Sequence, residues 1–464
     1  MVDVIASDII GAIVIARHGD RQGFYQDPIS YTASATAITP LGEDQEFQLG
    51  SLIRSIYLNA SSPKYIQGIS PATDLFQQTQ VAVRADAGGE GGVIFDSSIA
   101  LVQGLWPPTS QASISLANGS TVTSPLGGYQ YIPIESVEPN EDVSLEGFTD
   151  CSLLTAKTTK FYNSSAFLEK QAEAQSFLNS LPPFLDGRPV TLSNMFNIFD
   201  YMNVQSIHNV TFATRLPPTY LEQARALANY HEYGIFTDPS FDGIGNIAGR
   251  TMLPSLVTAL QRIVNNTDPL KLHYSAISYK PFLSLFNMTG VVATGQIPAG
   301  IVNYAAAVVM EVHQPSAGGQ PFIRFNFKNG TDDATFNLYN LSFPGFDGGS
   351  DVPVPTFIDA FQPAGVNNTQ WCNVCSQNTT RGCSLVTAAS SSHFLLSPHH
   401  DKISPVGAGF LGACLTIVVM SALVAALIFF GLLSVGKKRR HHEHVSDKDG
   451  SSVGSLHKGD SLRH

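Results

Sequence analysis

The sequence is short of positive charge. Its 26 lysines and arginines stand against 37 aspartates and glutamates, so the 464 residues carry a formal net charge of −11. A broad basic face for nucleic acid is therefore excluded, and any attraction for phosphate must come from a few local side chains. Hydrophobic residues make up 43% of the chain, which is enough for the core of a large globular protein.

Cysteine is also scarce. Five cysteines occur, and the four that precede residue 406 lack the flanking pattern of a redox or zinc motif: Cys151, Cys372, Cys375 and Cys383. An even set in an exported chain favours disulfide bonds, and four cysteines allow three pairings, all of which stay open. We expect neither a metal site nor a cofactor.

The amino terminus lacks the features of a signal peptide. No lysine or arginine precedes Arg17, Asp3 and Asp8 interrupt the apolar run, and the stretch 9–16 is needed as a strand. We expect a true start with a signal peptide upstream, in preference to export through a carboxyl-terminal segment alone.

The run 406–435 has no charged residue and is strongly apolar, and the basic cluster 437–440 follows it. About twenty apolar residues span a bilayer, so this run predicts one transmembrane helix with a short cytoplasmic tail, 436–464, expected to be disordered. The rest would be extracellular or lumenal. Ten glycosylation sequons agree with that topology: Asn59, Asn118, Asn163, Asn209, Asn265, Asn287, Asn329, Asn340, Asn367 and Asn378.

The segment 13–21, Ile-Val-Ile-Ala-Arg-His-Gly-Asp-Arg, is the most informative part of the chain. A strand that ends there presents His18 at its carboxyl end, where open α/β sheets bind ligands. Arg17 and Arg21 supply forked donors that match a phosphoryl group, and Gly19 would let the backbone approach it. The pattern fits phosphoryl transfer through a phosphohistidine at His18, with no metal required.

Three further segments extend the pattern: Thr39-Pro40-Leu41-Gly42, Gln103 to Pro108, and Ala248 to Leu253. With the His18 segment they resemble the histidine acid phosphatases, the larger branch of the phosphoglycerate-mutase-like histidine phosphatases. The resemblance covers about residues 9–346. It implies an α/β fold with a core sheet flanked by helices and a mainly helical inserted cap, and it implies a phosphomonoester substrate.

The chain departs from the family pattern at two places. A third phosphate-binding arginine would follow a Ser-Thr-Asp triplet, but Ala72-Thr73-Asp74 leads to Gln77, and Arg84 is predicted to lie too far along a helix to replace it. The proton donor would be a His-Asp pair, but Ile277 and Ser278 stand there. Isoleucine cannot donate a proton, and serine is a poor acid.

Other residues could supply the proton. The candidates are Asp20, Asp27, His208 and the pair His231-Glu232, whereas His273, four residues before position 277 on one strand, is predicted to be out of reach. A structural role is favoured for His231-Glu232, and Asp20 is expected to orient an arginine.

The predicted organisation places the core in residues 1–120 and 250–346, the cap in 121–249, and a cysteine-containing extension with a Ser/Thr-rich stalk in 347–405. Two functions stay open. The protein is either a membrane-anchored, glycosylated acid phosphatase acting through His18, or a catalytically impaired relative that binds a phosphorylated ligand or serves as a surface interaction protein.

Overall fold

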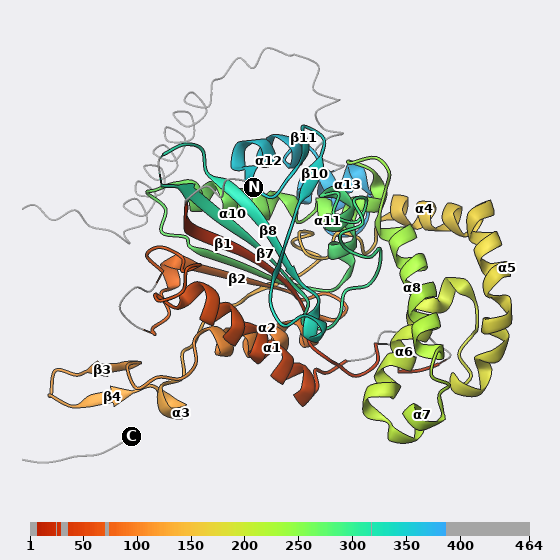
Figure 1. The fold of residues 1–464 in the computed structure, drawn as a ribbon, viewed down its shortest axis with the longest axis horizontal. Helices are drawn as coiled ribbons and strands as arrows, with labels where there is room; N and C mark the ends of the chain where they lie inside the picture. The colour runs from red at the N-terminus through yellow and green to blue at the C-terminus, as the bar shows by residue number, and fades with distance from the viewer. Residues whose placement is uncertain (1–6, 25, 29–35, 70–73, 317, 387–464) are drawn as a thin grey trace, which may run out of the picture. The chain divides into compact units, whose positions relative to one another are not determined.

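The computed structural model describes residues 7–24, 26–28, 36–69, 74–316 and 318–386. Eight strands form the main sheet: β1 (Ser7–Arg17), β2 (Val81–Asp86), β5 (Glu135–Val137), β6 (Leu272–Ile277), β7 (Ala307–Pro315), β8 (Phe322–Lys328), β9 (Asn337–Tyr339) and β12 (Val352–Pro353). Their order is β12-β8-β7-β1-β6-β2-β5, with β9 paired to β8 (Figure 1). From β1 to β5 neighbouring strands run parallel, and from β1 to β12 they run antiparallel.

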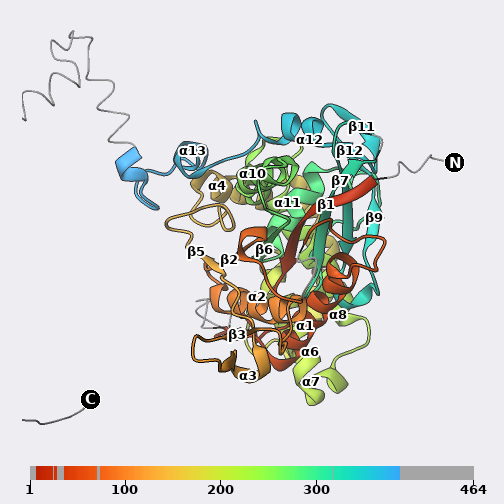
Figure 2. The same cartoon turned by 90° about the vertical axis from the view of Figure 1, so that its left-hand side faces the viewer.

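Helices cover both faces of this sheet (Figures 1 and 2). The α-helices are α1 (Pro40–Ile53), α2 (Gly91–Leu105), α3 (Pro125–Gly128), α4 (Ser152–Tyr162), α5 (Ser165–Ser180), α6 (Met195–His208), α7 (Val210–Arg215), α8 (Tyr220–Phe236), α9 (Ile247–Arg250), α10 (Leu253–Val264), α11 (Lys280–Met288), α12 (Val354–Phe361) and α13 (Asn368–Val374). The predicted mixed α/β fold is confirmed.

The alternation of side chains along β1 creates the two layers. Ile13 and Ile15 enter a core cluster with α10, α11 and α12, whereas Val14 and Ala16 enter a second cluster with α1 and α2. Because helices pack on both sides of the sheet, both faces of β1 are buried, which explains its continuous apolar sequence.

Helices α4 to α8 gather beside the sheet around an apolar cluster of their own (Figure 1). Phe167 and Leu178 of α5, Met202 of α6 and Leu227 of α8 are members of it. Residues 112–140 contain α3, β5 and an exposed hairpin of β3 (Ser113–Ser115) and β4 (Thr121–Thr123). Three-residue strands are too short for their alternation to be visible in the sequence.

Two disulfide bonds confirm the cysteine prediction and select one pairing, Cys151 with Cys375 and Cys372 with Cys383. The first bond ties the start of α4 to the residue that follows α13. Near it, the Trp371 indole is fully buried and donates a 2.7 Å hydrogen bond to the Gly147 carbonyl. A further hairpin, β10 (Leu341–Phe343) with β11 (Phe346–Gly349), packs Phe343 onto α12.

The predicted membrane localisation is corrected. In the part of the chain that the structure describes, no helix is long and apolar enough to cross a bilayer. The longest of these helices, α8, has 17 residues and includes Glu222, Arg225 and Glu232, whereas a span needs about twenty predominantly apolar residues. The run 406–435 and the tail 436–464, on which the prediction rested, lie outside the described residues. The membrane assignment is therefore withdrawn.

Candidate active site

His18 lies at the carboxyl end of β1, in the middle of the sheet. Its backbone N–H donates a 3.2 Å hydrogen bond to the carbonyl of Ile277 at the end of β6. Gly19 follows because α1 begins very close by: a Cβ on Gly19 would lie 2.4 Å from the carbonyl oxygen of Gly42. The sequence had assigned this glycine to ligand approach, but here the neighbouring backbone requires it.

The ring of His18 is oriented as a nucleophile would be. The side chain is completely buried, and Nδ1 lies 2.8 Å from the Gly19 carbonyl oxygen. A carbonyl only accepts, so Nδ1 carries a proton, and Nε2 is the atom that faces outward from the strand end. The Nε2 atom, however, contacts Glu90 Oε2 at 2.7 Å.

Glu90 reaches His18 from the turn between β2 and α2. Four glycines surround it, in the sequence Gly88-Gly89-Glu90-Gly91-Gly92. Two buried acidic side chains hold the turn in place: Asp86 accepts from the Gly88 N–H at 2.9 Å, and Glu146 accepts from the Gly89 N–H at 3.1 Å. The turn therefore delivers one carboxylate to the nucleophile candidate.

Two carboxylates pair with Arg21. Its Nη2 lies 3.0 Å from Glu90 Oε1, and its Nη1 lies 2.9 Å from Asp200 Oδ1 on α6. Burial alone would raise the pKa of Glu90, but Arg21 and His18 outweigh it and hold that pKa well below its ordinary value. Burial lowers the pKa of His18, while Glu90 opposes that shift. Glu90 is thus anionic and occupies the place between His18 and Arg21.

Arg17 is held differently from Arg21. No carboxylate of the described residues pairs with it; its Nη1 donates to the carbonyl of Val302, and the aromatic rings of Tyr304 and Tyr279 lie 4.4 Å and 5.2 Å from the guanidinium carbon. The side chain is 6% exposed, and its Nε has no hydrogen-bond partner. Burial lowers the pKa of Arg17.

The structure places three of the predicted alternative proton donors, Asp20, His208 and Asp27, away from the ring of His18. Asp20 is completely buried and accepts a 2.7 Å hydrogen bond from His208 Nε2 on α6, so it positions a histidine rather than an arginine. Thr39, which caps α1, donates to the same Asp20 oxygen. Asp27 is exposed. None of these groups contacts His18.

Gln77 lies at the wrong end of the sheet for a phosphate ligand. Val81, which opens β2, pairs with Leu272, and Leu272 pairs with Ala12 of β1. Gln77 precedes Val81, whereas His18 lies six residues beyond Ala12, about 20 Å along the strand direction at the rise of a β-strand. The residue that faces His18 after β2 is Glu90, so the proposed correspondence at Gln77 is replaced by one at Glu90.

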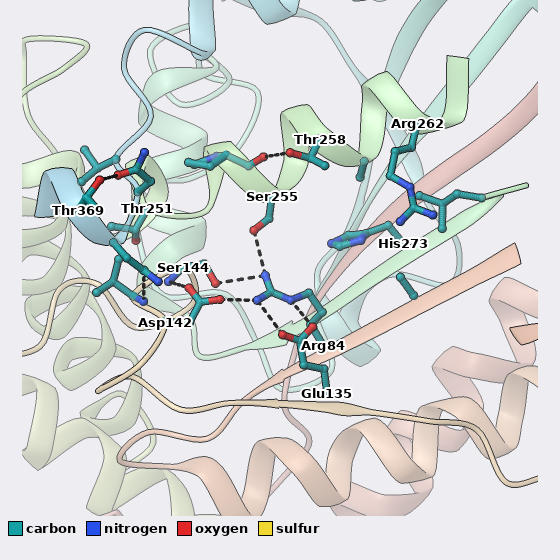
Figure 3. Close-up of a pocket in the computed structure, with 18 residues that line it drawn as sticks. Arg84, Glu135, Asp142, Ser144, Thr251, Ser255, Thr258, Arg262, His273 and Thr369 are labelled. Atoms are coloured by element: carbon teal, nitrogen blue, oxygen red, sulfur yellow. Dashed lines mark hydrogen bonds and ion pairs between the residues drawn. The ribbon is translucent and has the colours of Figure 1, made fainter. Parts of the chain in front are cut away.

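Arg84 belongs to β2, not to a helix, and its guanidinium lies in a different cavity (Figure 3). There it pairs with Glu135 and Asp142 and donates to Ser144 and Ser255. His273 lines the same cavity, and burial together with Arg84 and Arg262 lowers its pKa to about 4. Neither residue is near His18, as the strand spacing predicts for His273.

Ile277 and Ser278 do end β6 beside His18. Ile277 pairs with Arg17 across the strands and buries its side chain in the core, and the Ser278 hydroxyl is buried without a partner. Neither side chain can act as the proton donor that the family pattern places here.

His231 and Glu232, expected to have a structural role, are buried in the wall of a cavity of about 430 Å³ that Arg17 and Arg21 also line. His231 Nδ1 lies 2.8 Å from Glu232 Oε1, so Nε2 is left to accept from the Tyr162 hydroxyl at 2.7 Å. The Tyr279 hydroxyl donates to Glu232 Oε2 at 2.7 Å. Sequence reasoning missed Glu90, Asp200, Tyr279 and Tyr304; the doubled glycines around Glu90 were the one visible signal.

The sequence matches no protein-family model, and no curated protein matches it. Solved structures do match. A phytase of Hafnia alvei is 13% identical with a TM-score of 0.52, covering 80% of this chain and 98% of its own. Phytases of Citrobacter braakii and Klebsiella sp. ASR1 have TM-scores of 0.51 at 12% and 13% identity, covering 79% and 78% of this chain and 99% and 96% of theirs. The chain therefore has the phytase fold, which the resemblance to histidine acid phosphatases implies.

Proposed function

We propose that this protein is a non-hydrolytic relative of the histidine acid phosphatases, in which Glu90 occupies the place of the phosphoryl group and the remaining cavity binds a ligand. The observation that carries the proposal is the pair of contacts from one carboxylate, at 2.7 Å to His18 and 3.0 Å to Arg21. These are the groups that a phosphohistidine reaction would require to be free.

Electrostatics support this reading. At about 4 Å and an effective dielectric constant of about 20, two like unit charges repel by about 4 kcal/mol, and a phosphomonoester dianion would meet that repulsion twice over at Glu90. Displacing Glu90 instead would break its charge-assisted hydrogen bond with Arg21, worth about 1.5 to 3 kcal/mol, and its close contact with His18. Both routes weaken phosphate binding.

The absence of a proton donor at Ile277 and Ser278 also argues against hydrolysis. Loss of a general acid costs about 10² to 10⁴ in rate, and loss of one charge-stabilising donor costs about 10² to 10³. Ile277 and Ser278 supply no proton, and a carboxylate stands where a third cation would help. Glu90 itself is a poor acid here, because Arg21 and His18 keep its pKa well below the ordinary value.

The hydrolytic reading makes a different prediction for the same residue. If Glu90 were the proton donor of a phosphatase, Glu90→Gln would abolish activity against alkyl phosphates. The fold by itself does not favour that reading, since folds host many functions. Hafnia alvei phytase has been solved with myo-inositol hexakis sulphate, whereas three acidic side chains, Glu90, Asp200 and Glu232, line the cavity of this chain.

Phosphate release by the purified full chain tests the proposal. p-Nitrophenyl phosphate and glycerol 2-phosphate should be supplied between pH 3 and 7 to the wild type and to His18→Ala. We expect no difference between the two proteins with either substrate. Release that depends on His18, and that falls in Glu90→Gln, would establish the enzyme and overturn the proposal.

A further inference from the structure

The hairpin of β3 and β4 forms a ribbon that stands clear of the main sheet and its helices (Figure 1). The two strands pair with each other, with Ile114 opposite Val122, and within the described residues neither pairs with any other strand. Every residue of both strands is exposed. An isolated two-stranded ribbon is at best marginally stable in water, so this one lacks the packing that usually holds such strands together.

The ribbon has one apolar face and one hydroxyl face. Successive side chains of a strand point to opposite faces, so Ile114, Leu116 and Val122 share one face, with exposed fractions of 64%, 43% and 50%. The Leu116 N–H donates to the Ser120 carbonyl, which continues the pairing toward the turn. The opposite face carries Ser113, Ser115, Thr121 and Thr123. A contiguous exposed apolar face of this kind marks a contact surface.

The segment that carries the ribbon has no charge. The 38 residues between Asp96 and Glu135 include no acidic side chain, no lysine, no arginine and no histidine, although charged residues make up 14% of the chain. Exposed strands are usually protected against association by charged side chains, especially lysine, or by proline. β3 and β4 contain neither. No charged side chain on this ribbon therefore opposes its packing on another apolar surface.

We propose that the apolar face of the ribbon packs on the same face of a second copy of this chain. A two-fold interface places a surface patch against its own copy, so a charged patch would meet a like charge. The whole chain carries a net charge of −11, which keeps copies apart elsewhere. The uncharged ribbon offers a surface on which two copies meet without that repulsion, whereas a basic partner would be drawn to the acidic surface of the chain. In the pair, Ile114 and Val122 of each copy lie between the two ribbons, and the hydroxyl faces stay in water.

Analytical ultracentrifugation of the full chain over a hundredfold range of concentration tests the pairing. We expect a reversible equilibrium of monomer and dimer, because two short ribbons bury less area than a standard interface and associate weakly. Val122→Lys places a charge in the apolar face and should weaken the dimer at least tenfold. Thr123→Lys places the same charge on the next residue of the same strand, on the hydroxyl face. It is the matched control and should leave the equilibrium unchanged.

Four results would overturn the proposal. The first is a chain that is monomeric at every concentration, and the second is a dimer that Val122→Lys leaves intact. The third is equal weakening by Val122→Lys and Thr123→Lys, which would indicate pairing through the strand edges. The fourth is a monomer that sediments with phosphatidylcholine vesicles unless Val122 is replaced, which would assign the apolar face to a lipid surface. If Val122→Lys does not fold, Ile114→Lys on the paired strand places its charge on the same face and should have the same effect.

Discussion

The loop that carries Glu90 should make the stability of the protein depend on pH in a specific way. Asp86 is 3% exposed at the end of β2. Burial, followed by the nearby Glu146, raises its pKa from 3.8 to about 8, despite the hydrogen bond from the Gly88 N–H and the charge of Lys280. In the unfolded chain the same carboxyl would ionise near its ordinary pKa.

Proton linkage gives the sign and the size of this change in folding stability with pH. Between pH 3.8 and about 8 the folded protein holds a proton on Asp86 that the unfolded chain has released, so folding stability falls as the pH rises through that window. One proton changes the free energy of unfolding by at most about 1.4 kcal/mol per pH unit, or about 2.7 kcal/mol from pH 5 to pH 7. Asp86→Asn removes this dependence and keeps the oxygen that accepts from Gly88.

Denaturant unfolding of the wild type and of Asp86→Asn at pH 5, 6 and 7 measures the effect. The variant should gain on the wild type by about 1.4 kcal/mol with each unit of pH. Asp347→Asn, an exposed carboxyl on β11, is the control and should follow the wild type closely. A constant difference between Asp86→Asn and the wild type at all three pH values would refute the protonated, buried Asp86.

Three other changes have defined outcomes. Burial would raise the pKa of Glu311, but His313, Lys64 and Tyr57 hold that pKa at about 2. The ionised Glu311 therefore stabilises the fold above pH 4.5, and this stabilisation is lost as the pH falls toward 2. Glu311→Gln should lower the free energy of unfolding by about 3 kcal/mol at pH 7 and make stability less dependent on pH in acid, as denaturant unfolding would measure. Gly42→Ala would place a Cβ 2.1 Å from the Asp20 carbonyl oxygen, whereas a Cβ on Gly23 would meet open space. Gly42→Ala should therefore lower the melting temperature and Gly23→Ala should not; equal melting temperatures of the two variants would contradict the close approach of Gly42 to Asp20. The side-chain amide of Asn287 donates hydrogen bonds to the Asp238 carbonyl and to Asn246 Oδ1. After expression in a secretory host, mass spectrometry should therefore find a glycan on the exposed Asn59 and none on Asn287; a glycan on Asn287 would contradict these hydrogen bonds.

Much of the fold could be predicted because its signals are local. The β-branched run before His18 predicted a strand that ends there, and the structure has it as β1. The arrangement of strands across the sheet was not predictable in the same way. Gln77 and Arg84 were placed on a helix because nothing in that stretch shows that Val81 pairs with Leu272.

The candidate site was predicted only where one segment carries it. Arg17, His18 and Arg21 lie within five residues; Arg17 and Arg21 line one cavity, and His18 contacts Glu90 in its wall. Glu90 and Asp200 come from segments about 70 and 180 residues away, and only tertiary packing aims them at Arg21. The predicted membrane localisation was wrong: in the described part of the chain no helix is long and apolar enough to cross a bilayer.

Binding of orthophosphate to Glu90→Gln tests the central claim most directly. Glutamine keeps the size of the side chain and removes the negative charge between His18 and Arg21, while Glu173→Gln, an exposed carboxyl on α5, serves as the control. Calorimetric titration with orthophosphate at pH 6 should show no binding to the wild type or to Glu173→Gln at millimolar concentration, and clear binding to Glu90→Gln that disappears when Arg21→Ala is added. Tight binding of orthophosphate to the wild type, equal to that of Glu90→Gln, would contradict the claim that Glu90 holds the phosphate site closed.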